Sequence, residues 1–573
     1  MHLLIPFLSL AQIAGVASSV AGPAQSPSVI ETGAAMAKMH AAMQVKPTGD
    51  VDADFVAMMV AHHQGAIDMA QTQLRFGHNE RLRRIAQEII VTQQQEIAAM
   101  RMALGKPLTT SVPESAISHR DRVYAAEQFS NTISVTDPAD NKLLGVIRLG
   151  DPVPGNLSPL YRGQLLVHGL GFSPDHRTIA AVSIGSNSVT FIDTRTNAVK
   201  HITYVGRSPH EAFFTPDGKE VWVTVRGENY VAILDATTYE EKLRITVPNG
   251  PGMQIFSPDG KYGYVCSSFT PETVVITVAD HQIVGRVPQV SSFCPNIAAS
   301  PRGDQVWFTL KDVGKVMVFG AHPPFAVLKT IDTGPITNHV NFAANANGTF
   351  AYVTVGGLNE VQVFRTDDFS KMATIPVGKL PHGLWPSGDG TRIYVGLEND
   401  DRLVAIDALA NRVIATVPIG QAPQALAYVS DAVPDGDGTR GLQPLGVAGE
   451  VAHVSLVAPA VAKNAKGAGT MNAPTSVSLF DQGLVQVLQA SVTGLEPKQP
   501  YALALSRRPD GGGPLEPLAA FTTNAAGSAI VNTIGPIRSL IRGGNDEQRR
   551  YVVIVAGTPT RPGALMQIQA KQD

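Results

Sequence analysis

The sequence predicts a multidomain protein: a small α-helical bundle, then a seven-bladed β-propeller, then a small antiparallel β-sandwich. The helical prediction rests on a methionine- and alanine-rich segment near the N-terminus, and the propeller on a central repeat of about 43 residues. Short alternating β-type runs beyond a Gly/Pro-rich linker predict the sandwich. The expected boundaries are 1–21 for a signal peptide, 22–112 for the helical domain, 113–430 for the propeller, 431–448 for the linker and 449–573 for the sandwich.

Composition supports a globular, β-rich protein. Of the 573 residues, 44% are hydrophobic and 16% are charged, and the 53 glycines and 40 prolines are typical of a chain with many turns. The formal net charge of −3 gives no basic surface for nucleic acid. Nucleic-acid binding is therefore not expected.

The first residues predict export. An apolar run is followed by small residues, and Ser19-Val20-Ala21 resembles the A-x-A site after which signal peptides are cleaved. The segment before the apolar run has no Lys or Arg, which is atypical. No later stretch approaches 18 uninterrupted apolar residues, so we expect no stable membrane span and a periplasmic or secreted protein.

The helical domain is expected to hold three helices between about residues 29 and 104. Eight of the fourteen methionines lie between Met36 and Met102. In the first helix, Met36, His40 and Met43 share one face because they fall at i, i+4 and i+7. In the second, His62 falls on the apolar stripe, and His63 lies about 100° away around the helix.

Methionine and histidine in this pattern suit a soft metal. Thioether sulfur selects Cu(I), with Ag(I) as its analogue, and imidazole is a ligand for copper. The alternative is ordinary packing, because methionine fills irregular gaps in helical cores. A small bundle gains better-defined packing from Leu and Ile, so the repeated use of methionine favours metal binding.

Two motifs in this segment carry a family resemblance. The HHxGAIxMA pattern at 62–70 and the QxxEIxxM pattern at 93–100 resemble the DUF305 family of exported helical proteins, which includes periplasmic copper-binding proteins. The resemblance covers residues from about 30 to 105 and implies metal contacts from His62, His63, Met69 and Met100. Helical spacing adds neighbouring residues as candidates, namely Met36, His40, Met43, Met58 and Met59.

The central region repeats from about residue 122 to residue 429. Turn-and-strand copies such as FTPDGKEVWVTV and FSPDGKYGYVC recur, as expected for four-stranded propeller blades. These copies resemble the YVTN-type seven-bladed propellers. The first copy lacks its innermost strand, whereas QALAYV at 424–429 is an innermost strand with no blade after it. We therefore expect this last strand to close the ring.

One position recurs just before each innermost strand, and in four copies it is histidine: His168, His210, His339 and His382. Equivalent positions of a propeller ring its central channel, so these four are a candidate second metal site. The alternative is that P-H-G is simply the entry turn of the repeat. Met253 and Asn296 interrupt the ring, which argues against a complete multinuclear cluster.

Two cysteines, Cys266 and Cys294, fall in neighbouring copies of the repeat. They are compatible with a disulfide between adjacent blades or with two free buried thiols, and the pattern alone favours neither. The C-terminal region has no evident catalytic set, so we expect an accessory or docking role for it.

Taken together, these features predict an exported copper-binding protein that sequesters or transfers Cu(I) or Ag(I), with the propeller as platform. We expect a binding protein rather than an enzyme. The first alternative is a metal-dependent propeller oxidoreductase or lactonase-like hydrolase that uses the channel residues. The second is a protein-interaction scaffold that recruits a protein partner through the propeller or the C-terminal domain.

Overall fold

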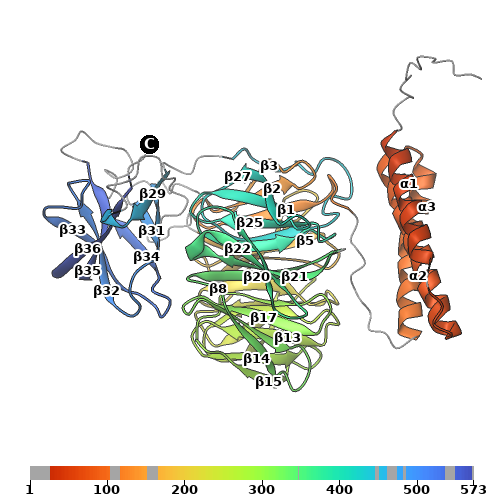
Figure 1. Cartoon of the computed structure of the whole chain (residues 1–573), viewed down its shortest axis with the longest axis horizontal. Helices are drawn as coiled ribbons and strands as arrows, with labels where there is room; N and C mark the ends of the chain where they lie inside the picture. Colours follow the sequence, from red (N-terminus) through yellow and green to blue (C-terminus); the bar gives the residue numbers. More distant parts are fainter. Residues whose placement is uncertain are drawn as a thin grey trace, which may run out of the picture. The chain divides into compact units, whose positions relative to one another are not determined.

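The computed structural model divides the chain into two compact units, 1–112 and 113–573 (Figure 1). It describes residues 26–44, 46–103, 116–150, 165–345, 347–445, 451–460, 474–481, 486–535 and 549–570. The expected signal peptide lies outside these residues. No helix among them is both long and apolar enough to cross a bilayer.

The N-terminal unit contains the three expected helices, which are α1 (Pro27–Met43), α2 (Val51–Phe76) and α3 (Glu80–Ala103). The side chain of Asp50 caps α2 by accepting hydrogen bonds from the backbone N–H groups of Asp52 and Ala53. Such a cap satisfies donors that the first helical turn leaves without a partner.

Helix α2 lies between the other two. A Cβ atom at Gly65 would fall 2.4 Å from the Met39 sulfur, so glycine lets α1 approach here. Nε2 of His63 lies 2.7 Å from a carboxylate oxygen of Glu96 on α3. Because two residues turn a helix by about 200°, Gly65 and His63 face nearly opposite sides of α2. The unit is therefore a layer of three helices with α2 in the middle.

Seven four-stranded antiparallel sheets follow, confirming the seven-bladed propeller. The first blade consists of β28 (Pro423–Val429), β1 (Arg122–Glu127), β2 (Thr132–Asp137) and β3 (Lys142–Arg148). The second, third and fourth consist of β4 (Val167–Phe172), β5 (Thr178–Ser183), β6 (Ser188–Asp193), β7 (Val199–Tyr204); β8 (Pro209–Phe214), β9 (Glu220–Val225), β10 (Tyr230–Asp235), β11 (Glu241–Thr246); and β12 (Pro251–Phe256), β13 (Tyr262–Ser267), β14 (Glu272–Thr277), β15 (Ile283–Pro288).

The remaining three blades have the same order. They consist of β16 (Ile297–Ala299), β17 (Gln305–Leu310), β18 (Lys315–Gly320), β19 (Val327–Asp332); β20 (Thr337–Asn345), β21 (Gly348–Val355), β22 (Glu360–Arg365), β23 (Lys371–Pro376); and β24 (Pro381–Pro386), β25 (Arg392–Leu397), β26 (Arg402–Asp407), β27 (Arg412–Pro418). A short 3₁₀ helix, η1 (Gly356–Leu358), follows β21.

Ring closure follows the sequence prediction. Strand β28, from the end of the repeat region, pairs antiparallel with β1, from its beginning. The second strands of the blades are buried along almost their whole length because neighbouring blades cover both faces. The outermost strands are largely exposed. This closure removes the free innermost edge that an open array would have.

The two cysteines pair. Cys266, on β13, and Cys294, just before β16, form a disulfide between the fourth and fifth blades. Of the two arrangements that the sequence left open, the structure therefore has the bond between adjacent blades.

The C-terminal domain differs from the predicted sandwich. It is one continuous eight-stranded antiparallel sheet in the order β33-β32-β35-β36-β29-β30-β31-β34. The hydroxyl of Thr533 on β34 donates to the carbonyl oxygen of Leu518 on β33, so the two end strands meet and the sheet is a nearly closed barrel. Its strands are β29 (Val451–Val457), β30 (Thr475–Asp481), β31 (Gln486–Val492), β32 (Pro500–Ser506), β33 (Leu515–Thr522), β34 (Ala529–Gly535), β35 (Tyr551–Thr558) and β36 (Arg561–Gln569).

The described part of the expected linker, 431–445, packs on the propeller. The side-chain amide of Asn197 donates to the carbonyl oxygens of Gly438 and Arg440, and Gln443 forms an isolated β-bridge with Val146. These contacts join the first two blades to the segment that follows the closing strand.

Candidate functional site in the propeller channel

The structure brings the four channel histidines into one cluster. Each lies at the start of an innermost strand, on β4, β8, β20 and β24. The ring centroids of His168 and His210 are 4.3 Å apart, those of His339 and His382 are 4.8 Å apart, and those of His168 and His382 are 6.2 Å apart. All four side chains are buried. The shared repeat position thus produces a continuous imidazole cluster around the channel.

The polar residues at the interrupted positions bond to part of this cluster. The side-chain amide of Asn296 lies 2.9 Å from the Met253 sulfur and 3.2 Å from Nδ1 of His339. Nδ1 of His382 lies 3.1 Å from the carbonyl oxygen of Gln424. Nε2 of His339 is buried and has no hydrogen-bond partner among the described residues.

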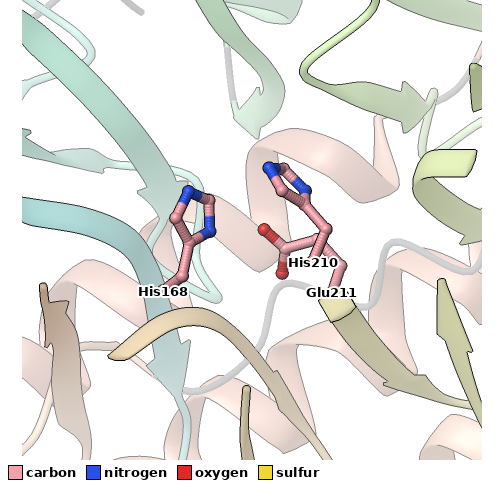
Figure 2. A group of neighbouring side chains, drawn as sticks. All are labelled: His168, His210 and Glu211. Atoms are coloured by element: carbon pink, nitrogen blue, oxygen red, sulfur yellow. The ribbon is translucent and has the colours of Figure 1, made fainter. Parts of the chain in front are cut away.

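Glu211 joins His168 and His210 to form the group that best fits a metal ion (Figure 2). Each residue offers one ligand atom, and the three atoms lie within 4.8 Å of one another. Figure 2 shows the Glu211 carboxylate turned toward the space between the two rings. A Cβ atom at Gly169 would fall 2.6 Å from a carboxylate oxygen of Glu211, so the glycine of the P-H-G-like motif provides the room.

The polar atoms of this group lack partners. Apart from an interaction between the Glu211 carboxylate and the backbone N–H of Leu170, Nδ1 of His168, Nδ1 of His210 and both carboxylate oxygens of Glu211 are buried without a hydrogen bond of ordinary geometry to any described residue. Buried polar atoms are almost always paired, because leaving one unpaired costs roughly 1–3 kcal/mol. Four such atoms in one place suit a bound ligand, and a metal ion would accept lone pairs from the two imidazoles and from the carboxylate once it has lost its proton.

Burial sets the protonation of the cluster. Desolvation lowers the pKa of His168 to about 3 and holds the pKa values of His210, His339 and His382 well below the usual range. Desolvation also raises the pKa of Glu211 to about 8, although the backbone N–H of Leu170 opposes this rise. The imidazoles are therefore neutral at neutral pH and ready to bind a cation, whereas the Glu211 carboxyl must lose a proton to do so.

A second set of charged residues lies near the cluster, and sequence reasoning missed it. Arg226, Lys311 and Glu398 are each the first residue after the second strand of a blade, following β9, β17 and β25. Burial raises the pKa of Glu398, whose carboxylate bonds to the side chains of Gln424 and Gln489. Aligning the copies at the end of the second strand, as in VTVR, FTLK and VGLE, would have found all three.

Beneath the histidines the channel holds a cavity of about 100 Å³. Polar groups of Glu211, Asn296 and His339 line it together with apolar residues. Deeper in the channel, the stacked rings of Phe213 and Trp385, 6.3 Å apart, fill the space. The cavity has room for a few water molecules or a small substrate group beside the candidate metal ligands.

The C-terminal sheet contacts the side of the propeller where the cluster lies. Phe480 packs on Phe129 with a ring separation of 4.4 Å. The side-chain amide of Asn399 donates to the Ser476 hydroxyl, and Gln489 bonds to Glu398 as described above. The domain expected to be accessory therefore reaches a charged residue at the channel mouth.

The helical unit places the predicted copper ligands differently from the sequence expectation. His62 is exposed, and His63 is the buried residue of the pair. Both ring nitrogens of His63 are engaged, with the carbonyl oxygen of Met59 and with Glu96, each at 2.7 Å. The inward position predicted for His62 is wrong because α2 packs on two sides, so its buried residues do not form the single stripe that the sequence suggested.

The remaining candidates in this unit are spread over its surface and its interfaces. Met36, His40 and Met58 are exposed, whereas Met43, Met59, Met69 and Met100 are half-buried. The ion pair between Lys38 and Asp68, at 3.0 Å, shows how α1 lies antiparallel along α2.

One further acidic group lies at the propeller surface. His119 and Asp137 are hydrogen-bonded at 2.8 Å, and Asp140 completes the group. The partners of His119 raise its pKa, chiefly through the bond to Asp137. Since these groups already satisfy one another, they do not form a site comparable to that in the channel.

Comparison with solved structures finds matches of limited similarity. A hydrazine synthase from Kuenenia stuttgartiensis has 20% identity and a TM-score of 0.42, with 48% of this chain and 90% of that chain covered. The periplasmic gluconolactonase PpgL of Pseudomonas aeruginosa has 20% identity and a TM-score of 0.44, with coverages of 54% and 99%. A functionally unknown protein from Desulfotomaculum acetoxidans DSM 771 has 14% identity and a TM-score of 0.46, with coverages of 54% and 98%.

Comparison of sequences assigns the N-terminal unit. No curated protein matches this chain. A family model does match the segment where the motifs lie, from residue 12 to residue 104. That part of the chain is similar to the family described as Domain of unknown function (DUF305).

Proposed function

We propose that this protein is a metal-dependent propeller enzyme whose channel binds a divalent transition-metal ion through His168, His210 and Glu211. The observation that carries the proposal is the convergence of these three buried side chains, whose polar atoms form no hydrogen bond of ordinary geometry with a described residue. Two imidazoles and a carboxylate suit zinc, copper(II), iron(II) or manganese(II), and copper(II) binds such sites tightly. A softer ion such as Cu(I) prefers thioether ligands.

The reaction that these residues support best is hydrolysis of a small ester or lactone. A divalent ion in this position would polarise a carbonyl group as a Lewis acid. His339 is neutral, and because the Asn296 amide donates to its Nδ1, its Nε2 carries the proton and can donate a hydrogen bond to the carbonyl oxygen of the substrate. The cavity beside His339 and Glu211 has room for a carbonyl group. An oxidoreductase with a redox-active ion in the same site is the alternative within this class.

Metal titration of the full chain tests the proposal. We expect isothermal calorimetry to give one tight channel site that is lost in His168→Ala/His210→Ala and weakened at least tenfold in Glu211→Gln. His119→Ala, in the surface acidic group, is the matched control and leaves this site unchanged. Equal metal affinity of the wild type and the double variant would contradict the proposal. Loss of lactone hydrolysis in His339→Ala, with metal affinity retained, would assign His339 as the hydrogen-bond donor to the substrate.

We further propose that the helical unit binds Cu(I), or its analogue Ag(I), along the groove between α1 and α2. The specific support is the register of these helices, fixed by the Met39–Gly65 approach and the Lys38–Asp68 ion pair. In this antiparallel register Met43 lies level with His62 and Met36 with Met69, on the same side of the groove. Such a site would store copper or supply it to the propeller.

The ligand set for this second site changes in one respect. His63 is already bonded at both nitrogens, so we assign it to holding α3 against α2 rather than to binding metal. A bicinchoninate competition assay with Met36→Leu/Met43→Leu tests the groove, and unchanged Cu(I) affinity in this variant would rule the groove out.

The Cys266–Cys294 disulfide supports an oxidising compartment, and hence the proposed periplasmic or secreted location. A protein partner for the propeller or C-terminal domain stays a prediction.

A further inference from the structure

Two cations flank the histidine cluster without a carboxylate partner. Arg226 and Lys311 follow the second strands of the third and fifth blades. Within the described residues, neither forms an ion pair or a side-chain hydrogen bond to an acidic group. Arg226 is partly covered as a residue, but its Nε is buried and unpartnered. Buried cations of this kind are normally paired, so their arrangement calls for an anion.

The surroundings of Arg226 shape what it can bind. Its guanidinium carbon lies 5.1 Å from the ring centroid of Phe293 and 5.7 Å from that of Phe269. Both rings lie within cation–π distance of the guanidinium, an interaction that leaves its N–H donors for a ligand. The edge of a guanidinium matches the two oxygens of a carboxylate, which it binds with two parallel hydrogen bonds.

The strand register places this subsite beside the candidate metal ligands, because Arg226 and Lys311 follow second strands that end at the mouth where the innermost strands begin. The positive charge of Arg226 acts on His168 and His210, and that of Lys311 acts on His168, His339 and His382. The four imidazoles are themselves neutral, so the two cations are not offset by the cluster. Glu398 offsets part of the charge of Lys311 only.

We propose that Arg226 and Lys311 form a subsite for the carboxylate of a small anionic substrate, held next to His168, His210 and Glu211. The inference deepens the proposed function, on which it rests, by naming the charge that the substrate carries. The carboxylate binds the edge of Arg226 and the ammonium of Lys311, and the reacting carbonyl group then reaches the cavity near His339. The substrate class is a carboxylate-bearing ester or lactone rather than a neutral one.

Access to the channel fits this assignment. Within the described residues, the C-terminal sheet contacts the first, sixth and seventh blades, at Phe129, Gly357 and Asn399. Arg226, Phe269 and Lys311 belong to the third, fourth and fifth blades, and Phe269 is 53% exposed. An anion can therefore approach from the side of the mouth where the two cations lie.

A titration of the full-length protein with sodium acetate tests the subsite, with acetamide as the uncharged isostere at constant ionic strength. Saturation-transfer NMR on metal-free protein should show acetate binding at least tenfold tighter than acetamide. Arg226→Gln should weaken acetate binding at least tenfold, and Lys311→Met should also weaken it. Arg226→Lys, which keeps the charge but loses the paired donors, should fall between Arg226→Gln and the wild type.

The matched control is Arg365→Gln. Arg365 also lies over a phenyl ring, that of Phe350 at 5.9 Å. It is the last residue of β22, the third strand of its blade, and so does not follow a second strand as Arg226 does. Equal acetate and acetamide affinities, or equal losses in Arg226→Gln and Arg365→Gln, would overturn the subsite. Co²⁺ absorbance on the same samples separates the two proposals. Acetate binding without a Co²⁺ site would contradict the metal proposal alone. A Co²⁺ site, together with equal acetate affinity in wild type and Arg226→Gln, would contradict the subsite alone.

Discussion

At the residue scale, burial decides the chemistry of the channel. Four imidazoles that would titrate near neutral pH in water are kept neutral, and one carboxyl is kept protonated. The four histidines could be predicted because they share one repeat position. Glu211 could not, because it follows His210 at a position where the neighbouring copies have Gly169 and Gln254. Its role depends on whether its side chain points into the channel, which the sequence alone does not show.

The raised pKa of Glu211 predicts how metal binding depends on pH. At pH 7 the carboxyl is mostly protonated, since its pKa is about 8. Binding of a cation should therefore release about 0.9 proton at pH 7 and about 0.1 at pH 9, because the histidines contribute none. Calorimetry in buffers of different ionisation enthalpy measures this number. Proton release that stays constant from pH 7 to pH 9 would contradict the assignment of Glu211.

The same group predicts a stability change in the metal-free protein. The folded chain keeps a proton on Glu211 from pH 4.5 to about 8, where the unfolded chain has released it. The folded state therefore binds more protons, and the free energy of unfolding should fall with rising pH by up to about 1.4 kcal/mol per pH unit across this window. Glu211→Gln should remove this contribution.

Urea unfolding with EDTA present, followed by tryptophan fluorescence at pH 5 to 8, measures the slope. All three tryptophans, Trp222, Trp307 and Trp385, lie in the propeller, so the signal reports this part of the chain. Glu240→Gln, which changes an exposed carboxylate, is the control and should keep the wild-type slope. Parallel slopes for wild type and Glu211→Gln would show that Glu211 does not hold the extra proton.

At the scale of elements, helical periodicity predicted the three helices, but not which faces they bury. The apolar stripe through His62 is a correct reading of α2 in isolation. In the structure α2 contacts α1 through Gly65 and α3 through His63, on opposite sides. A periodic pattern cannot distinguish a helix with one partner from one with two, and this is why the exposure of the paired histidines was predicted in the wrong order.

The close approach at Gly65 predicts the effect of a larger residue. Gly65→Ala would place a Cβ atom 2.4–2.6 Å from three side-chain atoms of Met39, so α1 must shift. We expect a loss of about 1–3 kcal/mol in the stability of the helical unit. Gly33→Ala on α1 is the matched control, since nothing lies within 4 Å of its added Cβ. That change should stabilise the helix by about 0.5–1 kcal/mol.

Thermal melting of the full chain, followed at 222 nm where helices dominate, compares the two glycine variants. A lower first transition in Gly65→Ala and a higher one in Gly33→Ala are expected. Similar melting curves for both variants would mean that α1 does not pack on α2 at Gly65.

At the scale of the whole molecule, the repeat predicted the propeller because equivalent strands must occupy equivalent places in a closed ring. The unmatched first and last copies even predicted the closing pair of β1 and β28. The C-terminal domain lacks such internal symmetry. Alternating strands are the same pattern in a sandwich and in a barrel, so the sequence could not choose the nearly closed sheet. Nor could it show that Gln489 of this domain reaches Glu398 at the mouth.

The disulfide is a covalent link between the fourth and fifth blades, in addition to the strand pairing that closes the ring. Its cysteines are 28 residues apart, so the chain-entropy relation gives a stabilisation of about 3–4 kcal/mol. Replacing both cysteines with serine should lower the free energy of unfolding of the propeller by up to this amount. Urea unfolding monitored by tryptophan fluorescence tests it, with reduced wild type as the comparison. An unchanged midpoint would contradict a stabilising role of this disulfide.

The central claim is that the propeller channel, not only the helical unit, binds metal. Anomalous diffraction from crystals of the full chain grown with Zn²⁺ tests it most directly, with data collected on both sides of the zinc absorption edge. We predict an anomalous peak within bonding distance of His168, His210 and the Glu211 carboxylate, and no such peak in crystals of the Glu211→Gln/His210→Ala variant. Zinc bound elsewhere in the wild type, with that position lacking anomalous signal, would contradict the account.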